Sequence, residues 1–122
     1  MENYNGTQDS TLRAFDIDWN VHDIFDRRVL KSTSWCEIED FHSLEERTGV
    51  FIFVNLLFQV KYIGIAEEGK MIAEIHDAII AGKSDGALLI KVLYTRSFDK
   101  TQTLEEDLII KYNPINNILS LE

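Results

Sequence analysis

The sequence predicts an α+β protein in which a small, mainly antiparallel three-stranded sheet is flanked by helices. Residues 49–54 and 59–65 are two runs rich in β-branched and aromatic residues, which is typical of a buried hairpin. Residues 68–81 place apolar side chains at spacings of four and three, which is typical of an amphipathic helix. The change from one pattern to the other indicates a sheet packed against helices.

A third strand and a second helix are expected after the turn sequence AGKSDG. Residues 87–95 (ALLIKVLYT) have the composition of a buried strand. Thr103 and Glu106 have the spacing of a capping box, and Pro114 ends the helix that they begin. We therefore expect strands near 50–55, 59–64 and 88–94, and helices near 69–81 and 103–112.

The N-terminal part has a different character. Residues 1–12 are polar and unpatterned, as in a flexible arm. Residues 13–48 are acidic with scattered aromatic side chains, and we expect an α-rich segment that packs on the core formed by residues 49–122. Within it, a short helix is expected from Asn20 to Val29, and a last helical turn at residues 43–49.

Composition limits the class of protein. The 122 residues are 45% apolar and suffice for one domain with a modest core. A single cysteine, Cys36, allows no intramolecular disulfide and no cysteine-clustered metal site, which favours a reducing compartment. The N-terminus does not have the pattern of a signal peptide, and no apolar run is long enough to cross a membrane. We expect a cytoplasmic protein with no membrane contact.

The net charge of −9 bears on partners. Residues 1–48 hold eleven acidic against five basic side chains, and residues 49–122 hold ten against seven. A protein that binds a phosphate backbone tightly normally shows a basic stripe, and this chain has none. We expect weak DNA binding, and a protein partner in preference to a nucleic acid.

Four motifs in residues 49–122 resemble those of the GIY-YIG nuclease superfamily. The two name-giving motifs correspond to Gly49–Phe51 (GVF) and Tyr62–Gly64 (YIG). His76 follows on the next helix, and Leu104 and Glu105 begin the pattern LExxLIxxYxPxxN, which closes with Asn117. The resemblance covers about 70 residues and implies the fold of that superfamily.

The resemblance also implies a chemistry, the hydrolysis of a phosphodiester bond with the help of one divalent metal ion. On this basis Glu105 is the metal ligand, for Mg²⁺ or Mn²⁺, and Tyr62 positions or activates the water. His76 is the partner on the helix, and Asn117 supports the constellation.

Three positions depart from the family pattern. Phe51 stands where the first tyrosine is expected, Ile72 where the arginine is expected, and Ile65 where a basic residue is frequent. Lys70 is the one cation near the missing arginine. Since the loss of one preorganised donor lowers a rate by about 10²–10³-fold, these changes together predict little or no cleavage.

The same residues also have ordinary structural explanations. Tyr62 fits a strand aromatic, and Glu105 lies at a helix start, where the helix dipole favours acids. His76 fits a partly buried structural histidine, and Asn117 fits a residue that closes the backbone after a proline. His22, His42 and Cys36 have no ligand or nucleophile spacing and fit two solvated histidines and a packed thiol.

Three functions follow. The first is a degenerate, non-cleaving GIY-YIG-like module that binds a protein partner, with Phe51, Ile65 and Ile72 making the site around Tyr62 and Glu105 apolar. The second is an active metal-dependent DNA endonuclease in which Lys70 or Arg96 replaces the arginine. The third is an acidic inhibitor that mimics nucleic acid.

Overall fold

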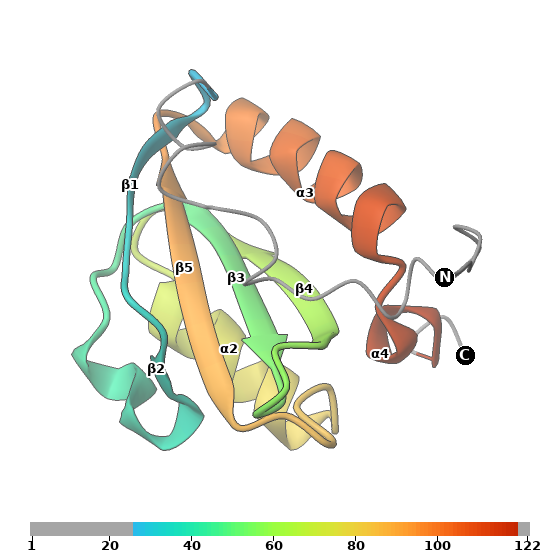
Figure 1. The fold of residues 1–122 in the computed structure, drawn as a ribbon. Coiled ribbons are helices and arrows are strands. Elements are labelled where there is room, and N and C mark those ends of the chain that lie inside the picture. Colours follow the sequence, from blue (N-terminus) through green and yellow to red (C-terminus); the bar gives the residue numbers. More distant parts are fainter. Residues whose placement is uncertain (1–25, 120–122) are drawn as a thin grey trace.

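The computed structural model describes residues 26–119, and the arm at residues 1–12 therefore lies outside the described residues. Its centre is a five-stranded antiparallel sheet in the order β1-β5-β3-β4, with the short β2 also paired to β5. Helices cover both faces, with α2 on one side and α3 on the other (Figure 1). In chain order the elements are β1 (Val29–Ser32), β2 (Cys36–Glu37), a 3-10 helix (Ile38–Ser43), β3 (Gly49–Val54), β4 (Val60–Ala66), α2 (Met71–Ile80), β5 (Leu89–Thr95), α3 (Phe98–Tyr112) and α4 (Ile115–Leu119).

The central strand β3 is buried on both faces, which explains its uninterrupted apolar sequence. Val50 and Ile52 point to the cluster that contains Leu104 of α3. Phe51 and Phe53 point to the opposite cluster, which contains residues of α2. Because side chains alternate along a strand, one short run supplies both halves of the core.

Both long helices end where their sequences provide a stop signal. At the end of α2 the backbone turns through Gly82, whose φ is +83°, and Lys83 N–H donates to the carbonyl of Ala78. At the end of α3, Asn113 adopts the left-handed conformation and its N–H donates to Ile109. Pro114 follows, where a helix cannot continue.

The α+β class is confirmed, and the three strands and two helices expected in residues 49–112 are present within a few residues. The expected start of the second helix near Thr103 is wrong, because α3 begins at Phe98. Ser97 is its N-cap, and the Ser97 hydroxyl accepts a hydrogen bond from Lys100 N–H. The helix therefore also includes residues 98–102, which precede its expected start.

The sheet is larger than expected because the segment before Gly49 supplies strands. Val29, expected at the end of a helix, begins β1 and pairs with Thr95. The helical turn expected at residues 43–49 is also absent, since the 3-10 helix ends at Ser43. Instead, Glu45 N–H donates to the Tyr94 hydroxyl at 2.8 Å, which holds this stretch along the sheet.

Candidate functional site

A pocket of about 300 Å³ opens at the β4 edge of the sheet, between the C-terminal half of α2 and the middle of α3. It brings together four of the residues singled out in the sequence. These are Phe51, Tyr62, Ile65 and Glu105. Residues from β3, β4 and α3 thus converge although more than fifty positions separate the first from the last. We call this pocket the edge pocket.

The floor of the edge pocket is formed by Phe51 and Gly64, which face each other across β3 and β4. Phe51 is 2% exposed, and its ring lies 5.4 Å from Phe53 and 6.1 Å from Tyr62, centroid to centroid. The position at which the family pattern expects a tyrosine therefore holds a buried ring without a hydroxyl. It supplies packing and no hydrogen bond.

Two polar residues of the expected site, Tyr62 and Glu105, have perturbed pKa values. Burial raises the pKa of the Tyr62 phenol, and the negative charges of Glu105 and Glu74 raise it further. Burial also raises the pKa of the Glu105 carboxyl, to which the charge of Glu106 adds. Tyr62 therefore keeps its proton at neutral pH and can donate a hydrogen bond, but it is a poor base.

Three charged residues that the sequence reasoning missed also line the edge pocket. Glu74 and Asp77 come from one face of α2, and Lys83 comes from the turn that follows. The spacing of three between the acids was a signal that both would share a helix face. The turn at Gly82 was a signal that the next side chain could fold back beside the helix.

Lys70 lies in a neighbouring hollow of about 450 Å³, which shares Ile65, Glu74 and Asp77 with the edge pocket. Arg96 lies elsewhere, in a depression that also includes Arg47 and Thr48. The Arg96 Nε group donates to the backbone carbonyl of Arg27 at 3.0 Å. Of the cations considered for the missing arginine, neither lines the edge pocket itself.

Ile72 and His76 do not line the edge pocket. Ile72 is half-buried and packs on the same side of the sheet as Phe51. His76 is 59% exposed, and its Nδ1 atom lies 3.8 Å from a carboxylate oxygen of Asp77. The expectation of a partly buried histidine on an apolar line is wrong, because that position of α2 faces solvent.

Asn117 has a structural role. Its side-chain carbonyl accepts from Ile63 N–H and its amide donates to the Ile63 carbonyl, both at 2.9 Å. These bonds dock α4 on the open edge of β4, where backbone groups would otherwise lack a strand partner. The adjacent Asn116 donates to the carbonyls of Lys83 and Asp85, so α4 also holds the turn beside the edge pocket.

The described residues do not offer a recognisable metal cage. Within residues 26–119, no group of three or more His, Cys, Asp or Glu side chains has the arrangement to hold a metal ion. Glu105 lines the edge pocket with Glu74 and Asp77, but these carboxylates do not form such a group. The described residues therefore provide no ready-made cage, and Glu105 alone would supply the single carboxylate ligand that the family resemblance implies.

The cysteine and the other two histidines were the remaining candidates for a ligand or a nucleophile. Cys36 is half-buried, and burial raises the pKa of its thiol, with a further contribution from Asp40. His42 is exposed beside the ring of Phe41, and His22 lies outside the described residues. No helix in the described part of the chain is long and apolar enough to cross a membrane.

Comparison with known proteins adds no family assignment. No protein-family model matches the chain, and no curated protein matches it.

Proposed function

We propose that this protein is a degenerate GIY-YIG-like domain that does not cleave DNA and that acts in the cytoplasm by binding a protein partner. The observation that carries this proposal is the composition of the edge pocket. Phe51 fills the place expected for a tyrosine hydroxyl, and Ile65 is the apolar neighbour of Tyr62 and Glu105. A phosphate there would meet three carboxylates, Glu74, Asp77 and Glu105.

The protonation states support the same proposal. Cleavage needs a water activated near neutral pH and positive charge over the phosphate. The Tyr62 phenol is protonated at neutral pH, burial raises its pKa further from that range, and the pKa of Glu105 is raised as well. A carboxylate whose charged form is disfavoured is also a weaker ligand for a divalent cation.

A titration of labelled duplex DNA tests the binding half of this proposal. Each phosphate contact contributes a log–log salt slope of about −0.9, so a protein with several contacts binds well at low salt. With its acidic charge, this chain should not bind duplex DNA at physiological salt and should bind negligibly at low salt. Micromolar binding that persists at physiological salt would contradict the proposal.

A second candidate function is an active metal-dependent endonuclease, and Lys83 is the observation that favours it. Lys83 lines the edge pocket together with Tyr62 and Glu105, so the pocket contains a cation although Ile72 occupies the position expected for the arginine. The test is Mn²⁺-dependent nicking of supercoiled plasmid by the wild type and by Lys83→Ala. Nicking that is lost in Lys83→Ala but kept in Lys100→Ala, a change on the exposed surface of α3, would favour this function over the first.

A further inference from the structure

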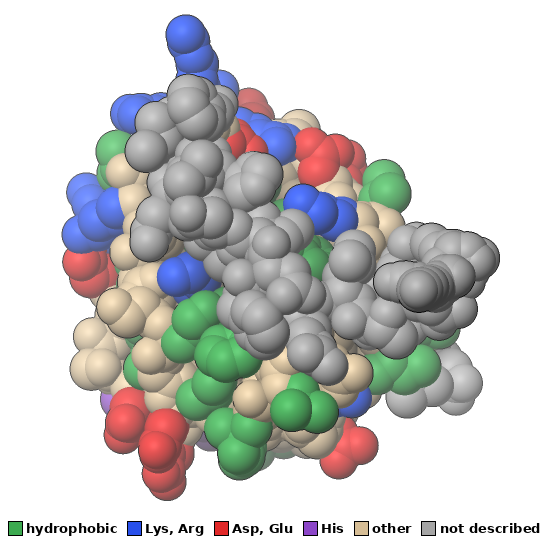
Figure 2. All heavy atoms as spheres, viewed as in Figure 1, with side chains coloured by type: hydrophobic (Ala, Val, Ile, Leu, Met, Phe, Trp, Pro, Cys, Tyr) green, Lys and Arg blue, Asp and Glu red, His purple; other side chains and the backbone are tan. Residues whose placement is uncertain are grey.

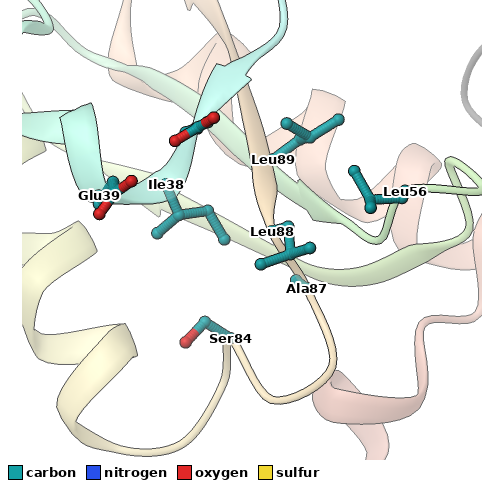
Figure 3. Close-up of a pocket in the computed structure, with 8 residues that line it drawn as sticks. Ile38, Glu39, Leu56, Ser84, Ala87, Leu88 and Leu89 are labelled. Atoms are coloured by element: carbon teal, nitrogen blue, oxygen red, sulfur yellow. The ribbon is translucent and has the colours of Figure 1, made fainter.

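Another hollow, separate from the edge pocket, is lined mainly by apolar side chains and has a volume of about 410 Å³. Figure 3 shows Ile38 of the 3-10 helix and Leu88, just before β5, extending into it, with Leu89 and Leu56 beyond them. Leu56 is 65% exposed and Leu88 is 55% exposed. We call this hollow, formed by Ile38, Leu56, Ala87, Leu88 and Leu89, the leucine groove.

One side of the leucine groove is acidic. Glu37 and Glu39 line it, and among its lining residues they are the charged ones. The pKa of Glu37 is raised, mainly by Glu39 and further by the negative charge of Asp40. In Figure 2 hydrophobic side chains gather on the lower part of the visible face, with acidic side chains at its margin. The groove is therefore apolar, and the carboxylates on its rim repel one another. A cation bound beside them would reduce this repulsion.

The groove is held in shape by the turn between β3 and β4. The side-chain oxygen of Asn55 accepts hydrogen bonds from the backbone N–H groups of Leu57 and Gln59, both at 2.9 Å. Phe58 has a φ of +62°, which is unfavourable for a bulky residue, and its ring contacts Trp35 edge-on at 5.5 Å. Because these contacts fix the turn, the exposed side chain of Leu56 is held in place by a preorganised loop.

The backbone of Leu88, one of the residues that line the groove, is already paired. Leu88 N–H donates to the carbonyl of Val54 at 2.8 Å, and the Leu88 carbonyl accepts from Ile38 N–H at 2.9 Å. A partner strand therefore cannot pair with the backbone of Leu88, and what this residue offers to a partner is its exposed side chain. Apolar side chains on one face with charge beside them are the features of an amphipathic helix.

We propose that the leucine groove binds an amphipathic helical segment of a partner protein, with apolar side chains seated on Leu56 and Leu88 and Lys or Arg side chains beside Glu37 and Glu39. The proposal rests on the proposed function in assuming a protein partner, and it names the surface and the chemistry of that partner. Exposed leucines in a groove lower the solubility of a free protein, and a covering helix removes them from water.

The test is fluorescence anisotropy of the full chain with a labelled peptide about five helical turns long. The peptide carries leucines at helical spacing on one face and lysines on the flanks. One control peptide has glutamate in place of lysine, and another has the same composition with the leucines scattered. We expect a dissociation constant on the order of 1–100 μM for the first peptide and no measurable binding of the controls.

Matched variants locate the binding. Leu56→Ser/Leu88→Ser should weaken it by at least about tenfold, and Glu37→Gln/Glu39→Gln by about threefold or more. Two control variants remove exposed side chains of the same kinds elsewhere on the surface. They are Ile80→Ser/Ile110→Ser for the apolar side chains and Asp99→Asn/Glu106→Gln for the acids. Both control variants should bind as the wild type does.

Three results would overturn the proposal. One is equal binding of the scattered peptide, which would indicate general attraction of cations to an acidic protein. Another is unchanged binding by Leu56→Ser/Leu88→Ser. The third is a wild-type dimer in sedimentation analysis that this variant makes monomeric, which would assign the groove to a second copy of the chain. None of these results changes the outcome of the DNA assays, so failure here is distinguishable from failure of the proposed function.

Discussion

The ring of Phe51 occupies the space that a side chain at Gly64 would need. A Cβ atom added at Gly64 would lie 2.4 Å from Phe51 Cζ, and the ring cannot move freely because Phe53 and Tyr62 are its neighbours. Aromatic rings often cover a glycine on the adjacent strand of an edge pair in this way. The floor of the edge pocket is thus fixed by a pair of residues, one large and one without a side chain.

Gly64→Ala should therefore lower the free energy of unfolding by about 1–3 kcal/mol, the usual cost of overpacking a core. The measurement is urea denaturation of the single variants and of the double variant Gly64→Ala/Phe51→Leu. The smaller leucine should accommodate the new methyl group, so the double variant should lose less than the sum of the two single losses. Additive losses would contradict the contact.

Asn117→Ala should release α4 from the edge of β4. Both hydrogen bonds to Ile63 are lost, which corresponds to a decrease of about 1–3 kcal/mol in the free energy of unfolding. Hydrogen exchange of the Ile63 amide should accelerate, whereas Ile118→Ala on the exposed side of α4 should leave it unchanged. Asn117→Asp should also be destabilising, since a carboxylate cannot donate to the Ile63 carbonyl.

Thr101→Val tests the polar contact between α3 and the sheet. The Thr101 hydroxyl is buried and lies within hydrogen-bonding distance of the hydroxyls of Thr48 and Thr95. Valine keeps the shape and removes these bonds, so we expect a decrease of about 1–2 kcal/mol in the free energy of unfolding. Thr103→Val, on the exposed surface of the same helix, is the matched control and should change it by less than about 0.5 kcal/mol.

The pKa of Tyr62 should be measurable as the difference between the ultraviolet phenolate titrations of the wild type and Tyr62→Phe. It should lie above the ordinary value of about 10, mainly because of burial. Glu105→Gln should lower it without restoring the ordinary value, because burial remains, and Lys100→Gln on the exposed surface should not change it. A pKa at or below about 10 in the wild type would contradict the burial of Tyr62 beside Glu105 and Glu74.

This shift also gives the sign of a stability effect. A phenol whose pKa is higher in the folded state contributes stability that is fully present below the unfolded-state pKa, near about 10. That contribution is lost as the pH rises through the folded-state pKa of Tyr62. Tyr62→Phe should therefore lose less stability than the wild type between neutral and strongly alkaline pH.

The elements of residues 49–112 were predictable from sequence because their periodicities are strong and local. The two strands before Gly49 were not, since β1 and β2 are short and exist only through pairing with β5. The same distinction applies to the edge pocket. Tyr62 and Glu105 could be found from the order of the motifs. Lys83 could not, because it reaches the pocket only through the way the chain turns after α2.

His76 and Asn117 illustrate the limit of reasoning by motif position. A histidine in the middle of a helix is placed by the rotation of that helix, which turns His76 towards solvent. The motif position of Asn117 predicts a catalytic support or closure of the backbone after Pro114. Its backbone N–H does bond to the Pro114 carbonyl, and its side-chain bonds to Ile63 dock a helix on a strand 54 residues away in sequence, a pairing that no local pattern contains.

The most direct test of the central claim is nicking of supercoiled plasmid, with single-stranded and branched DNA in parallel, in Mg²⁺ and in Mn²⁺. Wild type and Glu105→Ala should be indistinguishable and no faster than buffer with metal alone, because the edge pocket combines three carboxylates, a protonated tyrosine and apolar side chains at positions where the family pattern expects polar ones. Metal-dependent nicking by the wild type that Glu105→Ala abolishes would contradict the non-cleaving account and establish the endonuclease in its place.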